Sequence, residues 1–289
     1  MAARWMDRLA GSLEFSPGLT EVRSSPSPRC VQSGEAFLEG LGLRGSNVTG
    51  SNELINFSLN CPRYWEEVGH NPATTEEVEK LEESSHWGDM LERVNTKTGV
   101  RLDRDQNQLA WEMCGYERAW APEEDSPWCS FFSPEDLRLY NFREDLKYYY
   151  KMAYGHNISL QMTQPLLSDL LTSLQSSSHS ARLNFGHTNT VQPLLAAVGL
   201  YKDASHLLAS DYGSGTGHLW DVARISSFTS NLAWLVFQCE GEKRVMMFHQ
   251  ETAVVQPACG QLVCSLQQLV DTYSPLAVAD YTSTCRSAT

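Results

Sequence analysis

The chain has 289 residues, of which 42% are hydrophobic, so it is long enough to bury a substantial core and we expect it to be globular. Its 35 acidic and 22 basic residues give a formal net charge of −13, which argues against a general surface for nucleic acid or anionic membranes. No apolar run approaches the roughly 18 residues of a transmembrane helix, so no membrane span is predicted.

The first predicted elements are a strand over 19–24 and a helix that follows it. Ser27 and Pro28 are typical of the N-cap and the first position of a helix, and the apolar residues within 36–41 supply its buried face. Arg29 then lies in the first turn, where a cation opposes the helix dipole by some tenths of a kcal/mol. An anion could hold it there. The alternative is that Arg29 points to solvent or pairs with a nearby carboxylate.

The middle of the chain is polar and rich in helical patterns. We predict a mainly α-helical insertion over 46–179, set into an α/β core that consists of 1–45 and 180–289. Within the insertion, Ser133 and Pro134 are typical of a helix start. Leucines at 166–174 mark a further amphipathic helix.

Residues 182–203 (RLNFGHTNTVQPLLAAVGLYKD) predict a strand, a tight turn and a helix. The run 182–185 is compatible with a β-strand, and Gly186 permits a sharp turn. The apolar run 191–198 predicts a buried helix that stops at Gly199.

Three polar residues, His187, Thr188 and Asn189, lie where this strand ends and the helix begins. Backbone N–H groups at a helix start lack intrahelical partners and carry the positive end of the dipole, so this is a ready anion site. We expect Pro193 to fall in the first turn of the helix. The alternative is an ordinary connection, with Asn189 or Thr190 as the N-cap and His187 bonded to a backbone carbonyl.

The last third of the chain predicts a buried β-hairpin, formed by 232–239 and 244–249 around a turn that contains glycine. A closing helix is expected over 262–270. These elements add strands and a helix to the predicted α/β core.

The cysteines and sequons bear on cellular compartment. Eight cysteines lack the paired close spacing of a zinc site, so no metal site is predicted; disulfides and buried free thiols fit their number equally. Glycosylation sequons at Asn47, Asn56 and Asn157 favour the secretory pathway. The N-terminal residues MAARWMDRLAGSLEF, however, lack the apolar region of a signal peptide.

Two segments resemble the histidine acid phosphatases, in particular the multiple inositol polyphosphate phosphatase branch. FGHTNTVQPLLAAVGLYKD is similar to the family's C-terminal active-site segment, with its phenylalanine-glycine-histidine-alanine-glutamate run and glycine-aromatic-lysine-aspartate ending. Arg29 and Cys30 match an arginine-cysteine pair that follows a serine-ended strand. The resemblance implies a histidine-phosphatase-like α/β sheet flanked by helices with an inserted α-helical cap domain, the first βα unit being missing.

The resemblance also implies the chemistry of the site. In this family a histidine of an arginine-histidine-glycine motif attacks phosphorus, a second histidine and two arginines hold the phosphoryl oxygens, and an acid protonates the leaving alcohol. By this resemblance Arg29 and His187 are phosphate ligands, with Thr188 beside them. We therefore expect Arg29 and His187 to converge on one pocket. No metal and no organic cofactor are implied.

Two departures from the family put activity in doubt. No arginine-histidine pair occurs in the chain, so the nucleophile motif is lacking, and we expect that the sequence begins inside the domain. Asn189 stands where the family has its proton-donating glutamate, and an amide cannot give up a proton near neutral pH. A lost general acid typically costs about 10²- to 10⁴-fold in rate, and a lost nucleophile can cost as much as the whole catalytic unit.

The resemblance implies a phosphomonoester hydrolase of inositol polyphosphates such as phytate, with 2,3-bisphosphoglycerate as a second candidate substrate. We expect this chain alone to be nearly inactive. The resemblance implies small phosphate esters as partners. If the full-length protein has a signal peptide, we expect it in the secretory pathway, that is, in the endoplasmic reticulum lumen, at the cell surface or in the extracellular space. Two other classes stay open: a pseudophosphatase that binds inositol phosphates without turnover, and a secretory interaction protein that keeps only the scaffold. The sequence predicts no particular oligomeric state.

Overall fold

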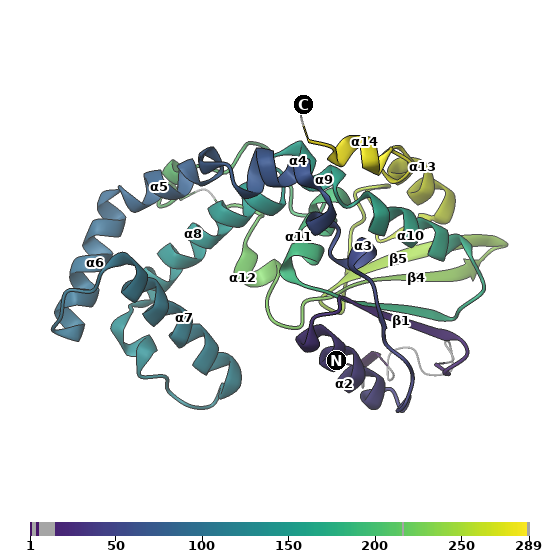
Figure 1. Ribbon diagram of the computed structural model, residues 1–289, viewed down its shortest axis with the longest axis horizontal. Coiled ribbons are helices and arrows are strands. Elements are labelled where there is room, and N and C mark those ends of the chain that lie inside the picture. Colours follow the sequence, from purple (N-terminus) through teal and green to yellow (C-terminus); the bar gives the residue numbers. More distant parts are fainter. Residues whose placement is uncertain (2–3, 6–14, 216, 288–289) are drawn as a thin grey trace. The chain divides into compact units, whose positions relative to one another are not determined.

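The computed structural model of the protein describes residues 1, 4–5, 15–215 and 217–287 (Figure 1). It divides into two compact units. Unit 1 comprises Met1–Asn71, Lys151–Lys202 and Ile225–Thr289, and unit 2 comprises Pro72–Tyr150 and Asp203–Arg224. These units group residues by contact, so the predicted insertion of 46–179 between 1–45 and 180–289 stays a prediction.

A three-stranded sheet in unit 1 joins distant parts of the chain. The strands β1 (Thr20–Ser24) and β3 (Ala181–Phe185) pair in parallel, and β2 (Thr49–Gly50) pairs in parallel with the other edge of β1. The register sets Ser24 opposite Phe185. Both predicted strands are confirmed, and their carboxyl ends lie at one edge of the sheet.

The helix α2 (Pro28–Gly40) packs on this sheet (Figure 1). Ser27 is its N-cap and Pro28 its first residue, as predicted. Apolar residues of β1 and α2 share a core cluster, to which the rings of Phe37 and Phe185 add an edge-on contact at 5.6 Å. The buried members of this cluster are Val22, Leu38, Leu41 and Leu43.

A second sheet in unit 1 is antiparallel. The hairpin of β4 (Leu232–Cys239) and β5 (Glu242–His249) is confirmed, although β4 is half-buried rather than enclosed. Its two turn residues, Glu240 and Gly241, both have positive φ, the geometry that matches the twist of paired strands. The short strands β6 (Thr252–Val254) and β7 (Val263–Ser265) also pair with β5.

The closing helix begins later than predicted. We expected it over 262–270, but Val263–Ser265 forms β7, because these residues complete a ladder on β5 that local sequence cannot reveal. The hydroxyl of Ser265 then accepts a hydrogen bond from the backbone N–H of Gln268 at 3.1 Å and caps α13 (Leu266–Ala277).

Unit 1 contains several further helices. The helices α10 (Gln164–Gln175), which confirms the predicted leucine-rich helix, and α13 pack together (Figure 1). The others are α3 (Asn52–Ile55), α4 (Pro62–Tyr64), α9 (Asn157–Gln161), α11 (Thr188–Ala197) and α14 (Tyr281–Cys285), with short single turns over Phe57–Asn60 and Trp65–Gly69.

Unit 2 is built from helices. The longest, α8 (Pro134–Met152), starts as predicted, because Ser133 and Asp136 exchange backbone-to-side-chain hydrogen bonds of 2.8 and 3.2 Å. The other elements are α5 (Glu76–Glu82), α6 (Ser85–Thr98), α7 (Arg104–Trp120) and α12 (Val222–Ile225), with single turns over Pro72–Thr75, Trp128–Phe131 and Ala209–Asp211.

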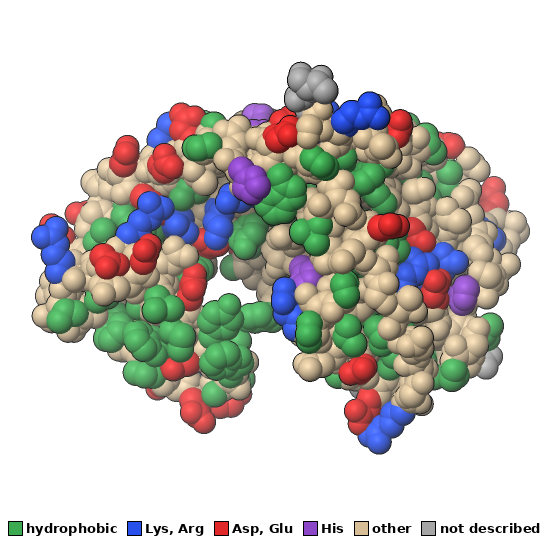
Figure 2. Space-filling view, in the orientation of Figure 1, with side chains coloured by type: hydrophobic (Ala, Val, Ile, Leu, Met, Phe, Trp, Pro, Cys, Tyr) green, Lys and Arg blue, Asp and Glu red, His purple; other side chains and the backbone are tan. Residues whose placement is uncertain are grey.

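One face of α7 carries exposed apolar side chains, and hydrophobic side chains gather over this part of unit 2 (Figure 2). Leu109, Tyr116 and Trp120 recur at helical spacing, and Trp120 is 73% exposed. The rings of Tyr116 and Trp120 stack with centroids 5.6 Å apart.

Six of the eight cysteines form disulfides. The pairs are Cys61–Cys285, Cys114–Cys129 and Cys259–Cys264, while Cys30 and Cys239 are free thiols. The first pair links Cys285, the last residue of α14, to Cys61, the N-cap of α4. Among the described residues, no helix combines the length and the apolar character needed to cross a bilayer.

Candidate functional site

The parallel pairing of β1 and β3 brings two distant segments together. The backbone N–H of Ser25 donates to the carbonyl of Phe185 at 2.9 Å, so the chain leaves both strands at the same point. After β1 it enters α2, which carries Arg29, and after β3 it turns into α11 at His187. The guanidinium Nη2 of Arg29 lies 3.2 Å from Nδ1 of His187. The expected convergence of these two side chains is therefore present.

The helix α11 starts earlier than the alternative interpretation assumed. His187 is the N-cap, with φ −121° and ψ 172°, and Thr188 is the first helical residue. Asn189 and Thr190 are therefore not caps, and Pro193 lies in the helix interior, where we had expected it in the first turn. The physical reason is that Thr190, inside the first turn, stabilises the helix start. Its Oγ1 accepts a hydrogen bond from the backbone N–H of His187 at 3.2 Å.

Gly186 is required by close packing. Its φ is not in the left-handed region, so backbone conformation alone does not call for glycine here. A Cβ at this position would lie 2.7 Å from Oγ1 of Thr190 and 2.9 Å from Cγ2 of Ile55. The hydroxyl of Thr190 also donates to the carbonyl of Ile55 at 2.7 Å. These contacts hold the start of α11 against α3.

Two further side chains that sequence reasoning did not assign to the site contact the ring of His187. Oγ of Ser25, a residue with no exposed surface, lies 2.8 Å from Nε2. The buried thiol of Cys30 donates to the carbonyl of Gly186 at 3.2 Å, and its Sγ lies 3.6 Å from each ring nitrogen. The signal for Ser25 was its place directly after the predicted strand over 19–24.

The electrostatics of the site favour an anion. Burial, and then the charge of Arg29, lower the pKa of the His187 imidazole below its usual 6.5, so the ring is neutral at neutral pH. Arg29 is exposed, and no carboxylate among the described residues forms an ion pair with it. The guanidinium thus presents its charge beside the first turn of α11.

Thr188 and Asn189 occupy the first two positions of α11, half-buried and exposed respectively. Their backbone N–H groups belong to the first turn, which has no intrahelical acceptors. The site therefore combines a permanent cation, an imidazole and a helix N-terminus. The catalytic or binding role of each residue stays a prediction.

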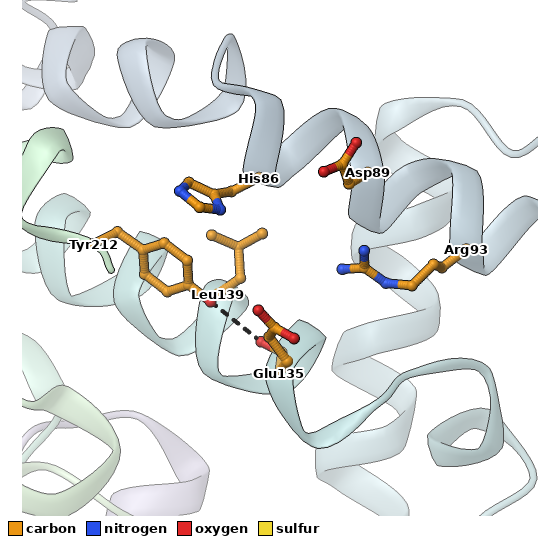
Figure 3. A pocket seen from close by; sticks show the side chains of 6 residues that line it. All are labelled: His86, Asp89, Arg93, Glu135, Leu139 and Tyr212. Atoms are coloured by element: carbon orange, nitrogen blue, oxygen red, sulfur yellow. Dashed lines mark hydrogen bonds between the residues drawn. The ribbon is translucent and has the colours of Figure 1, made fainter. Parts of the chain in front are cut away.

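A small pocket of about 40 Å³ lies within unit 2 (Figure 3). The side chains of α6 and α8 that face it include the carboxylates of Asp89 and Glu135 and the guanidinium of Arg93. That guanidinium, of Arg93, already forms an ion pair with the buried Asp136. The pocket is lined by His86, Asp89, Arg93, Glu135, Leu139 and Tyr212. Its acidic lining makes it a poor anion site, and sequence analysis had assigned it no role.

Within the described part of the chain, no cluster of three histidine, cysteine or acidic side chains has the arrangement of a metal site. The His187 site offers hydrogen-bond donors and fixed positive charge. Oriented donors of this kind stabilise negative charge on oxygen.

Comparison with known proteins identifies the family. Residues 15–250 match the family model described as histidine phosphatase superfamily (branch 2). The chain is 29% identical over 271 residues to multiple inositol polyphosphate phosphatase 1 of Drosophila melanogaster, covering 90% of this chain and 58% of that protein. It is 31% identical over 238 residues to the protein of the same name from Gallus gallus, covering 76% and 53%. The chain thus spans a little over half the length of these relatives.

Solved structures agree on the fold. The phytase from D. castellii superposes with a TM-score of 0.77 at 17% identity, covering 98% of this chain and 64% of that one. The Bifidobacterium longum multiple inositol polyphosphate phosphatase, solved in complex with inositol hexasulfate, gives a TM-score of 0.71 at 16% identity, covering 93% and 76%. The predicted α/β fold is thereby confirmed. Together with the family model, these findings establish that the chain belongs to the histidine phosphatase superfamily, branch 2.

Proposed function

We propose that this chain carries the phosphate-holding part of a phosphomonoester hydrolase site that acts on inositol polyphosphates. In this proposal Arg29, His187 and the N-terminus of α11 hold the oxygens of one phosphoryl group, with Thr188 beside them. The observation that carries it is the 3.2 Å approach of the Arg29 guanidinium to the His187 ring at a helix start. The names of the relatives, which are multiple inositol polyphosphate phosphatases, support the substrate class.

The three donors have complementary properties. A guanidinium is always charged and offers several N–H groups to phosphoryl oxygens. The backbone N–H groups at a helix start add fixed partial positive charge. The imidazole of His187 carries one N–H donor when it is neutral and two when it is protonated. Such preorganised donors stabilise charge that develops on oxygen during transfer of a phosphoryl group.

Turnover needs two groups that these residues do not supply. The chain contains no arginine-histidine pair, and Asn189, at the position of the family's proton donor, carries an amide. We therefore propose that this chain alone binds inositol polyphosphates but hydrolyses them little or not at all. The identity of Asn189 favours a second candidate, a pseudophosphatase that binds without turnover in any longer product.

The proposed location is the lumen of the secretory pathway, the cell surface or the extracellular space. The three disulfides fit a secreted or lumenal protein. Of the predicted glycosylation sequons, Asn47 and Asn157 are exposed, whereas Asn56 is half-buried and its side chain donates to that of Asn52 at 2.9 Å. Asn47 and Asn157 are therefore the sites best placed to carry a glycan.

Replacing Arg29 tests the phosphate-holding role. We expect Arg29→Ala to weaken binding of inositol hexasulfate about 10- to 150-fold, because a hydrogen bond to a charged group typically contributes about 1.5–3 kcal/mol. Calorimetric titration measures the dissociation constant. Arg44→Ala is the matched control, since Arg44 is also exposed but already pairs with Glu39. Equal affinity of the Arg29 and Arg44 variants would show that Arg29 does not hold the anion. If the wild-type chain itself did not bind inositol hexasulfate, only a role as a scaffold would be left.

The depressed pKa of His187 predicts how binding depends on pH. Sulfate esters keep their charge over the working range, so any change in affinity for inositol hexasulfate reports on the protein. The bound anion favours the protonated ring and raises its pKa above that of the free protein. Affinity should therefore rise as pH falls through the pKa of the complex, and level off below the pKa of the free protein.

The control for this pH dependence is His187→Gln, which cannot take up a proton. We expect this variant to bind with an affinity that varies less with pH than that of the wild type. An identical pH profile for both proteins would contradict the assignment of His187.

The proposed lack of turnover is tested with phytate. Purified wild-type chain should release no phosphate above the buffer background. Asn189→Glu should also release none, because a restored acid contributes only about 10²- to 10⁴-fold and no nucleophile is present. Release at an enzymatic rate that disappears in His187→Gln would overturn this part of the proposal.

A further inference from the structure

The hydrogen bonds of His187 fix which ring nitrogen carries the proton. A guanidinium has only N–H donors and no acceptor, so Nη2 of Arg29 can approach Nδ1 of His187 at 3.2 Å as a donor alone. Nδ1 must then be unprotonated. Because a neutral imidazole carries one proton, that proton lies on Nε2.

The hydroxyl oxygen of Ser25 then accepts the hydrogen bond that this N–H donates. Its Oγ lies 2.8 Å from Nε2 and is enclosed completely, so no solvent competes with the bond. The position of Oγ is itself held, since it accepts the backbone N–H of Ser27 at 3.3 Å. The backbone N–H of Ser25 in turn donates to the carbonyl of Phe185, directly before the turn to His187.

The other neighbour of the ring does not choose between its nitrogens. Sγ of Cys30 is equally distant from Nδ1 and Nε2, at 3.6 Å, and its thiol donates to the carbonyl of Gly186. Cys30 therefore packs against the ring without distinguishing its two tautomers. The guanidinium of Arg29 is the contact that distinguishes them, because it can only donate, whereas the hydroxyl of Ser25 can donate or accept and fixes the orientation of the ring.

We infer that Ser25 is a positioning residue that holds the ring of His187 in the orientation that keeps Nδ1 turned toward Arg29, whose N–H then fixes the Nε2–H tautomer. The inference rests on the proposed function and specifies how that site is organised. Rotating the ring by half a turn would place a carbon against Oγ of Ser25 and lose the bond. The two nitrogens thus have separate tasks, one structural and one exposed to the ligand.

Binding of an anion then couples to proton uptake at a defined atom. A proton from solvent forms an N–H bond at Nδ1, which gives an imidazolium that donates to an anion oxygen from Nδ1 and to Ser25 from Nε2. The charged and titratable groups that face the ring come from α2, namely the Arg29 guanidinium and the Cys30 thiol. Ser25, after β1, adds a hydroxyl that does not titrate in this range.

The tautomer can be read directly in the full chain. Two-bond proton–nitrogen spectra of ¹⁵N-labelled protein separate protonated from unprotonated ring nitrogens, and His187→Gln identifies the signals of His187 among the eight histidines. In the ligand-free wild type at mildly alkaline pH we expect Nε2 protonated and Nδ1 unprotonated. In Ser25→Ala the ring loses the bond that orients it, so we expect it to turn away from Arg29, the tautomers to mix and the two nitrogen signals to move toward each other.

Two further variants separate positioning from general damage. Ser24→Ala removes a neighbouring, equally buried hydroxyl that bonds to the backbone of Ser25 and does not contact His187, so it should leave the tautomer unchanged. Ser25→Thr keeps the hydroxyl and should restore the wild-type signals. Ser25→Ala should also weaken binding of inositol hexasulfate about 2- to 12-fold, the range for one hydrogen bond of about 0.5–1.5 kcal/mol.

A wild-type ring protonated on Nδ1 would overturn the inference, even if Ser25→Ala failed to fold. So would a folded Ser25→Ala protein whose His187 signals match those of the wild type. Failure of the proposed function looks different, because it appears as absent binding of inositol hexasulfate while the tautomer of the free protein is as inferred.

Discussion

The parallel pairing of β1 with β3 is the constraint on which the site depends. These strands lie more than 150 residues apart in the chain, and their register sets Ser24 opposite Phe185. Because parallel strands end at the same edge of a sheet, the segments that follow them must leave side by side. A slip of one residue would turn every side chain of a strand to the opposite face, and the apolar cluster beneath α2 resists such a slip. Packing of the core thus fixes the position of polar groups at the sheet edge.

The side chains at that edge conflict with simple helix energetics. Arg29 lies in the first turn of α2, where the dipole disfavours a cation by a few tenths of a kcal/mol to about 1 kcal/mol. Burial, and then the charge of Arg29, lower the pKa of His187, so the ring is neutral at neutral pH in the free protein. A bound anion offsets both effects, because it compensates the cation at the helix start and favours the protonated ring. An arrangement that is mildly unfavourable in the free protein and favourable with a bound anion is typical of a binding site.

The sequence predicted much of this fold because local signals agreed with the tertiary structure. The strands at 19–24 and 182–185, the Ser27–Pro28 helix start and the hairpin around Gly241 all carry short-range patterns. For features that depend on partners distant in the chain, the predictions were wrong or lacking. The strand β7 forms only because β5 offers an edge, and Gly186 is needed because Thr190 and Ile55 approach it.

The same distinction applies to the site. Arg29 and His187 could be named in advance from segments that resemble a known family, and the structure places them in contact. The bond from His187 to Ser25 could not be predicted, since it depends on the exact register and on the rotamers of both side chains. The roles of Thr188 and Asn189 stay predictions, because position at a helix start alone does not define chemistry.

A double-mutant cycle on Arg29 and His187 tests most directly whether the two side chains act as one anion site. Binding of inositol hexasulfate would be titrated calorimetrically for the wild type, Arg29→Ala, His187→Gln and the double variant. Groups that share a ligand couple by about 0.5–3 kcal/mol. The losses of binding free energy in the two single variants, added together, should therefore differ from the loss in the double variant by that amount. Losses that simply add would contradict a shared site.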